Sequence, residues 1–201
     1  MKKIIFSQRI DLVSEYGERR DCIDERLVKF IWDCGYFPVA INNISEKVDD
    51  FIAFIRPQGI ILSGGNDLAK YGGNASERDE VERKLIKYSL SNNIPLYAFC
   101  RGMQMVADYF NNELQYVTGH VTKRHMIYGK NGFKNREVNS YHHRGILQVK
   151  SPLIELARAS DGVIEAMKHE NNLILCTMWH PERCFPYCGD DIDMIKELFG
   201  Q

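Results

Sequence analysis

The sequence predicts one α/β domain in three layers, with a mostly parallel central sheet that carries helices on both faces. Short apolar runs alternate with amphipathic segments through the first half of the 201-residue chain, and several of the runs end in glycine-bearing turns. No linker, repeat or low-complexity segment divides the chain. Alternating strands and helices are the pattern of βαβ units, whose strands are parallel. We therefore expect a flavodoxin-like single domain over residues 1–201.

The first half supplies four strand-length apolar runs and four helical segments. In the first helical segment Leu27, Phe30 and Ile31 recur at helical spacing, and Gly35 ends the pattern. The strands are expected at residues 2–7, 37–41, 59–65 and 94–100, and the helices at residues 21–35, 49–55, 77–91 and 101–110.

The second half changes character, because turn signals separate segments that look like strands. Asn131-Gly132 and Asp161-Gly162 are two of these signals. Strands are expected at residues 113–120, 138–149, 162–170 and 172–180, and a helix over residues 190–199 closes the chain.

The composition excludes several classes of partner. Hydrophobic residues make up 44% and charged residues 26%, an ordinary globular balance. The net charge of −1 gives no reason to expect a nucleic acid polymer or a membrane as a partner, and no stretch approaches the roughly 20 apolar residues of a membrane span. The N-terminal apolar run is too short for a signal peptide. We therefore expect a cytoplasmic protein with reduced cysteines.

In one segment cysteine and histidine residues recur every four positions, which on a helix would place them on one face and suggests a zinc site. Prolines within this segment exclude a continuous helix. The prolines are Pro181 and Pro186, and the ligand types are Cys176, His180, Cys184 and Cys188. We therefore expect no metal and no organic cofactor.

The stretch "AFCRG", residues 98–102, joins an expected strand to an expected helix. A nucleophile elbow has small residues two positions before and after the nucleophile, because its tight turn leaves no room for larger side chains. Ala98 and Gly102 fill these positions around Cys100. The helix N-terminus would favour the thiolate. A buried core thiol is the competing interpretation, because free cysteine packs as a small hydrophobe.

The stretch "MWHPER", residues 178–183, offers a base for such a thiol. Pro181 favours an extended backbone at His180, and extended residues i and i+2 project to the same side. Glu182 could then accept a hydrogen bond from one imidazole nitrogen and leave the other facing Cys100. A packed core histidine beside a solvated carboxylate is the alternative.

A third strand end carries "LSGGND", residues 62–67. Paired glycines let the backbone approach a ligand closely and present N–H groups to it, although an ordinary turn would also use them. The strand–SGG, strand–CRGMQ–helix and strand–HPE order resembles the class I glutamine amidotransferase family. The segments "GIILSGGNDLAKYGG", "GHVTKRH", "NSYHH" and "WHPE" look like its branch that hydrolyses γ-glutamyl bonds.

The resemblance implies a role for each matching position. Cys100 would be the nucleophile, His180 the general base and then the acid, and Glu182 the residue that orients His180. The N–H groups of Gly65 and Arg101 would form the oxyanion hole. The glutamyl amino acid end would be held by Gln104, Tyr141 and His142. Position 98 departs from the family, where it is usually glycine, but alanine is also small.

The resemblance fixes the glutamyl half of the substrate and leaves the other half open. Cations lie in or beside the matching motifs: Arg19, Arg20, Arg78, Lys123, Arg124 and His125. Arginine pairs with phosphate oxygens in bidentate geometry, so these residues permit an anionic leaving group, although each alone could be a solvated charge. The whole chain resembles a member of the branch whose reaction would free glutamate and a cytidine diphosphoramidate.

Other interpretations stay open. The small-molecule substrate could be a γ-glutamyl-γ-aminobutyrate-type conjugate, or the chain could be a glutaminase subunit that passes ammonia to a separate synthetase. Outside this class it could be a non-catalytic binding module, or a cysteine protease or deglycase on a similar fold. The sequence gives no oligomeric state.

Overall fold

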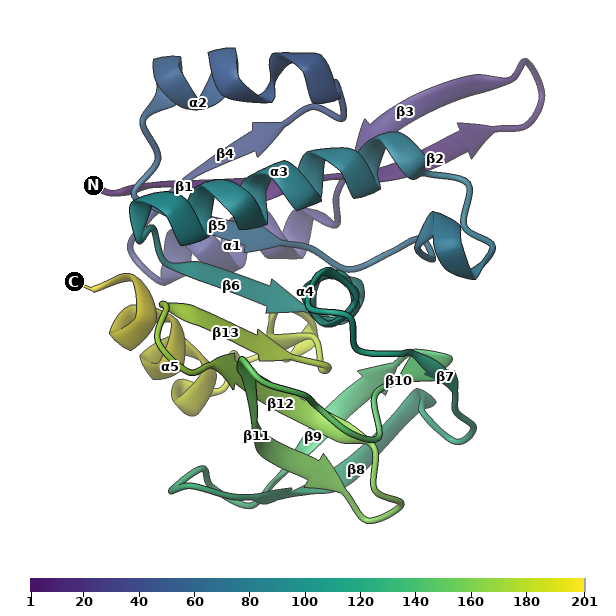
Figure 1. Ribbon diagram of the computed structural model, residues 1–201, viewed down its shortest axis with the longest axis vertical. Coiled ribbons are helices and arrows are strands. Elements are labelled where there is room, and N and C mark those ends of the chain that lie inside the picture. Colours follow the sequence, from purple (N-terminus) through teal and green to yellow (C-terminus); the bar gives the residue numbers. More distant parts are fainter. Residues whose placement is uncertain (201) are drawn as a thin grey trace.

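A nine-stranded sheet runs through the computed structural model, which describes residues 1–200 (Figure 1). Its strand order is β4-β1-β5-β6-β13-β12-β11-β8-β9. The first five of these strands pair in parallel and the remaining pairings are antiparallel. The strands are β1 (Lys3–Ser7), β4 (Phe37–Ile41), β5 (Gly59–Leu62), β6 (Leu96–Phe99), β8 (Val121–Gly129), β9 (Arg136–Tyr141), β11 (Leu153–Ala159), β12 (Ile164–His169) and β13 (Ile174–Thr177).

Helices cover both faces of the parallel half. They are α1 (Glu25–Asp33), α2 (Val48–Ile55), α3 (Ser76–Asn92), α4 (Arg101–Tyr109) and α5 (Gly189–Phe199). Side chains of α2, α3 and α4 share one core cluster with Ile5 and Ile60, whereas α1 and α5 share a second cluster with Ile4 and Ile61. Successive strand residues point to opposite faces, so each apolar run serves both layers. The predicted three-layer α/β fold is confirmed.

Two small ribbons lie outside the main sheet. The hairpin of β2 (Arg9–Val13) and β3 (Glu18–Cys22) extends from the end of β1, and β7 (Gln115–Tyr116) pairs with β10 (Arg144–Gly145) (Figure 1). Short 3₁₀ helices span η1 (Ser45–Lys47), η2 (Ala69–Tyr71) and η3 (Pro181–Arg183). Among residues 1–200 no helix is long and apolar enough to cross a membrane.

The structure corrects the sequence prediction in three places. Residues 21–22 end β3, and α1 begins only at Glu25, because the Asp24 side chain caps its first turn. The β2–β3 hairpin gives no apolar signal, since much of it is polar and exposed. Strands β8 and β11 were also missed, and only Gln115–Tyr116 of the strand expected at residues 113–120 forms a strand.

The carboxyl ends of β5, β6 and β13 lie at one edge of the sheet, because these neighbouring strands are parallel. Ser63, Cys100 and Met178 follow these three strands directly. Ligands of open α/β sheets bind at this edge.

Candidate active site

Cys100 occupies a strained turn between β6 and α4. Its φ of 51° and ψ of −112° lie outside the backbone regions that residues other than glycine ordinarily adopt. The turn is stabilised by Gly102, where an added Cβ would lie 2.2 Å from the backbone oxygen of Leu62. Ala98 is buried in β6, where a methyl group fits. The sequence therefore folds here as a nucleophile elbow.

His180 is held by its backbone and by its ring. Its N–H donates to Asn139 Oδ1 at 2.8 Å, and Asn139 Nδ2 donates to the carbonyl of His180 at 2.8 Å. The imidazole Nδ1 lies 2.7 Å from Glu182 Oε1 in η3. Both side chains of this pair are buried, with exposed fractions of 3% for His180 and 2% for Glu182. A hydrogen bond in such a site fixes the ring and leaves Nε2 for chemistry.

Charge on two neighbours changes the proton affinity of His180. Burial of the ring lowers its pKa, but the negative charges of Cys100 and Glu182 outweigh burial and raise the pKa of His180 to about 9. An imidazolium beside a thiolate is the ion pair that a cysteine nucleophile uses.

Gly64 and Gly65, in the loop that follows β5, form another side of the site. A Cβ on Gly64 would lie 2.8 Å from His180 Cε1 and 3.5 Å from Cys100 Cβ, so the bare backbone of Gly64 lies against both residues. Gly65 has a φ of +86°, and a Cβ there would lie 3.2 Å from the Arg9 side chain. Arg101 is the first residue of α4, where N–H groups have no carbonyl partner within the helix. The backbone here is therefore suited to stabilising an oxyanion.

A buried ion network supports both turns from α3. Arg78 donates to the carbonyl oxygens of Ser63, Gly64 and Gly65, and also pairs with Glu82. The side chain of Arg101 pairs with Glu82 and with Asp79. Burial lowers the pKa of Arg78 to about 10, which keeps the guanidinium charged at neutral pH. The network fixes the positions of the two loops relative to each other.

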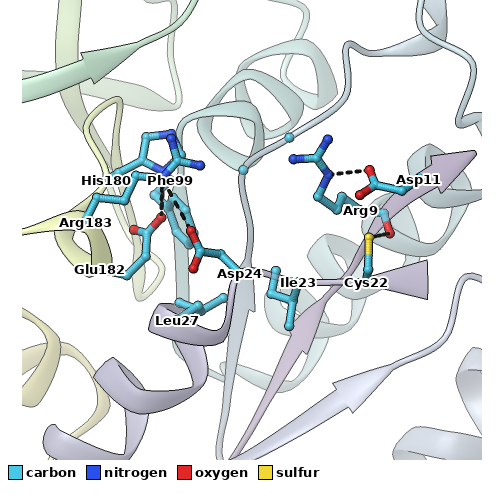
Figure 2. Close-up of a pocket in the computed structure, with 12 residues that line it drawn as sticks. Arg9, Asp11, Cys22, Ile23, Asp24, Leu27, Phe99, His180, Glu182 and Arg183 are labelled. Atoms are coloured by element: carbon cyan, nitrogen blue, oxygen red, sulfur yellow. Dashed lines mark hydrogen bonds and ion pairs between the residues drawn. The ribbon is translucent and has the colours of Figure 1, made fainter. Parts of the chain in front are cut away.

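A cavity of about 290 Å³ opens beside His180. Figure 2 shows Arg183 and Asp24 on the same side as His180 and Glu182, and Arg9 with Asp11 across the cavity. Arg183 Nε lies 3.7 Å from Asp24 and 3.6 Å from Glu182. The remaining lining comes from Cys22, Ile23, Leu27, Gly64, Gly65 and Phe99. The wall therefore presents two guanidinium groups, each beside a carboxylate, with Arg183 near Glu182 and Arg9 paired with Asp11 across the cavity.

The three residues expected at the glutamyl amino acid end lie in different surroundings. The Tyr141 ring is 38% exposed and stands perpendicular to the His180 ring, with centroids 5.5 Å apart. Gln104 is buried and donates to the carbonyl of Arg144, and His142 is buried against Glu165. Only Tyr141 is both open to solvent and beside His180.

The structure contradicts a substrate contact for Arg78, because its side chain is fully buried beneath the glycine turn. Arg19 and Arg20 lie on the β2–β3 hairpin and pair with Glu77 and Glu18. Both line another cavity, which shares no residue with the one beside His180. His125 lies on β8 near Glu165. None of these four residues lines the cavity beside His180.

Local sequence patterns did not reveal several residues that shape this site. Asn139, Glu82, Arg9, Arg183 and Asp24 reach it from five separate elements or loops. Asn139 does lie within the "NSYHH" motif, which could have marked it.

The model of the Peptidase C26 family matches residues 6–116 and 107–182 of the chain. Over 196 residues the chain is 34% identical to the gamma-glutamyl-CDP-amidate hydrolase of Campylobacter jejuni subsp. jejuni, with 96% of each chain covered. It is 29% identical over 168 residues to a glutamine amidotransferase-like protein of Lactococcus lactis subsp. lactis, with 69% of this chain and 70% of the relative covered. A solved glutamine amidotransferase of Thermotoga maritima shares the fold, with a TM-score of 0.65 at 13% identity, 98% of this chain and 83% of that chain being covered.

Proposed function

The chain belongs to the Peptidase C26 family of class I glutamine amidotransferases and hydrolyses γ-glutamyl amide bonds, and we propose that Cys100, His180 and Glu182 carry out the reaction. One observation supports the proposal above all. The strained turn at Cys100 and the paired His180–Glu182 come together at Gly64, although the two segments lie about 80 residues apart. A core thiol needs no such strain.

The proposed first step is attack of the Cys100 thiolate on the γ-carbonyl carbon. A carbon–sulfur bond forms, and the carbonyl electrons move to the oxygen, where the N–H groups of Gly65 and Arg101 stabilise the negative charge. One such donor typically contributes about 2.7–4 kcal/mol to the transition state. The oxyanion then collapses, the carbon–nitrogen bond breaks, and protonated His180 gives its proton to the leaving nitrogen.

The proposed second step hydrolyses the γ-glutamyl thioester on Cys100. His180, now neutral, takes a proton from water, and the resulting hydroxide attacks the thioester carbonyl. Glutamate leaves and the thiolate is restored beside the imidazolium. Glu182 orients the ring through both steps, since its carboxylate accepts from Nδ1.

We further propose that the substrate is a γ-glutamyl conjugate with an anionic leaving group of the CDP-amidate class. The relative with 34% identity over nearly the whole chain has this substrate in its name. In addition, Arg9 and Arg183 line the cavity beside His180. Guanidinium groups bind phosphate oxygens in bidentate geometry. A glutaminase subunit that serves a synthetase, and a γ-glutamyl-γ-aminobutyrate hydrolase, remain the competing functions.

Glutamate release by the purified chain tests the chemistry. Cys100→Ala should lower turnover by at least about 10⁴-fold, because the nucleophile is lost. Cys34→Ala is the matched control, since burial raises the pKa of the Cys34 thiol to about 12 and the side chain belongs to the core. Near-normal turnover by folded Cys100→Ala would refute the assignment.

Comparison of substrates tests the leaving group separately. With γ-glutamyl-CDP-amidate, L-glutamine and γ-glutamyl-γ-aminobutyrate, we expect the highest kcat/KM for the first. Arg9→Gln should raise KM for that substrate about tenfold and change KM for glutamine little, since a charge-assisted hydrogen bond contributes about 1.5–3 kcal/mol. Preference for glutamine would point to a synthetase partner while leaving the chemistry intact.

A further inference from the structure

Three of the six histidines converge on one buried carboxylate outside the proposed active site. Glu165 lies on β12 and is 0% exposed. His120 precedes β8, His125 lies on β8 and His142 follows β9. These segments belong to the antiparallel part of the sheet, drawn in green in Figure 1.

The contacts in this cluster are nearly equal in length, and they are longer than ordinary hydrogen bonds. Glu165 Oε1 lies 3.3 Å from His120 Nδ1, 3.3 Å from His125 Nε2 and 3.4 Å from His142 Nε2. N–H···O hydrogen bonds span about 2.7–3.2 Å. Among the described residues 1–200, neither carboxylate oxygen of Glu165 has a hydrogen-bond partner, and the Nε2 atoms of His125 and His142 have none either.

The remaining ring nitrogens indicate what faces Glu165. His142 Nδ1 lies 3.0 Å from the carbonyl of Arg144, an oxygen that can only accept, so Nδ1 carries the proton. In neutral His142 the Nε2 lone pair therefore points toward the carboxylate. His120 Nε2 lies 2.7 Å from Asp161 Oδ2, so the Nδ1 lone pair of neutral His120 lies toward Glu165, with Ser140 Oγ 3.5 Å from the same nitrogen. Lone pairs that face a buried carboxylate repel it unless a proton on the ring or another cation lies between them.

We propose that Glu165, His120, His125 and His142 bind a divalent transition-metal ion, with Zn²⁺ as the representative. In a tetrahedral zinc site with bonds of about 2.0–2.1 Å, neighbouring ligand atoms lie about 3.3–3.4 Å apart. The three nitrogen–oxygen distances fall in this range. The donor atoms of His120, His125 and Glu165 all lie within 4.8 Å of one another, and His142, which is not in that group, would complete the site from its position 3.4 Å from Glu165 Oε1.

The surroundings suit such an ion. Asp161 would be the outer carboxylate that orients a metal-bound imidazole, an arrangement common around zinc ligands. The His125 side chain is 19% exposed, which leaves a path for entry. A site with four protein ligands is closed, so the ion would be structural. It would join β8, β9 and β12, and β9 carries the Asn139 that holds His180.

Metal binding by the full chain tests the proposal. The Cys100→Ala background removes the proposed catalytic thiol, and the probes are Zn²⁺ by elemental analysis after gel filtration and Co²⁺ by visible absorption. We expect one ion per chain, with ligand-field bands and no thiolate charge-transfer band. At 100 times Kd the thermal midpoint should rise by about 5–10 °C.

Substitutions decide whether the ion lies in this cluster. Glu165→Gln should weaken Zn²⁺ binding at least about 100-fold, and Asp161→Asn about 10–100-fold. His143→Asn, at the exposed histidine next to His142, should bind normally. If Glu165→Gln does not fold, the partly exposed His125→Asn replaces it.

Three outcomes would overturn the proposal. The Cys100→Ala protein could take up no Zn²⁺, its Glu165→Gln and Asp161→Asn variants could take up as much Zn²⁺ as it does, or the Co²⁺ spectrum could show a charge-transfer band from cysteine. The cluster would then be a network of protonated imidazoles around Glu165. None of these outcomes bears on the proposed hydrolysis, which has its own readout.

Discussion

The His180–Glu182 pair and the Glu165 cluster both bring histidine next to glutamate, and they differ in whether the polar atoms of these side chains form hydrogen bonds. In the pair a single contact of 2.7 Å joins the imidazole to the carboxylate. In the cluster three imidazoles stay at 3.3–3.4 Å from one carboxylate oxygen. A short hydrogen bond makes the first arrangement complete by itself. For the second we propose a positive ion between its members. Contact length thus distinguishes the proposed proton-transfer site from the proposed metal site.

Substitution at His180 should separate the two regions most strongly. We expect His180→Gln to lower kcat/KM for glutamate release on the order of 10⁴-fold, because both proton transfers lose their carrier. His125→Asn, the corresponding change in the cluster, should leave kcat/KM within a few-fold. Comparable losses in the two folded variants would contradict the separation.

Asn139 tests whether the antiparallel region positions the base. Asn139→Ala removes both hydrogen bonds to the His180 backbone, and small misplacements of catalytic groups can lower rates about 100-fold. We expect kcat to fall about 10–100-fold while the pH profile keeps its shape. Asn172→Ala, on a surface turn, is the control and should be neutral. Unchanged kcat in Asn139→Ala would show that Glu182 and packing alone hold the ring.

The pH dependence should report the His180–Glu182 pair. Because the pKa of His180 is raised to about 9, the imidazolium that we propose as the proton donor to the leaving group is lost above that pH. We expect kcat/KM to fall about tenfold per pH unit beyond pH 9. An alkaline limb near pH 7 would indicate that the charges of Cys100 and Glu182 do not act on the ring as described.

The pH dependence of the free energy of unfolding should also follow the protonation of His180. A folded pKa above the unfolded value of about 6.5 gives a contribution that is complete below pH 6.5 and is lost as pH rises toward 9. The difference in free energy of unfolding between wild type and His180→Gln, measured by urea denaturation, should therefore decrease over that interval. A difference that stays constant would contradict the raised pKa.

The smallest effect on KM is expected at Arg19, a hairpin residue outside the cavity beside His180. Arg19 pairs with Glu77 at the surface and lines a cavity that shares no residue with the one beside His180. Arg19→Ala should change KM for the anionic conjugate less than twofold, whereas Arg9→Gln in the cavity should change it about tenfold. A large effect of Arg19→Ala would extend the substrate site along the hairpin from Arg9 to Arg19.

Much of the fold was predictable because its signals are local. The apolar runs of β1, β4, β5 and β6 and the helical spacing of α1 depend on neighbours a few residues away. The β2–β3 hairpin was missed, since its exposed polar strands carry no apolar run. The candidate triad could be named from two short stretches, "AFCRG" and "MWHPE", in which each chemical group comes with its own local geometry.

Short stretches of chain were enough to predict the layers and to suggest the elbow at Cys100 and the pairing of His180 with Glu182, because each depends on residues at most a few positions apart. The resemblance of the whole chain to a family decided between these interpretations and a core thiol with a core histidine. Long-range packing was needed to show that Arg78 is buried support, that Arg9 and Arg183 line one cavity, and that residues 120, 125, 142 and 165 meet. Sheet order and strand twist set these contacts, and no local pattern of charge or hydrophobicity encodes them.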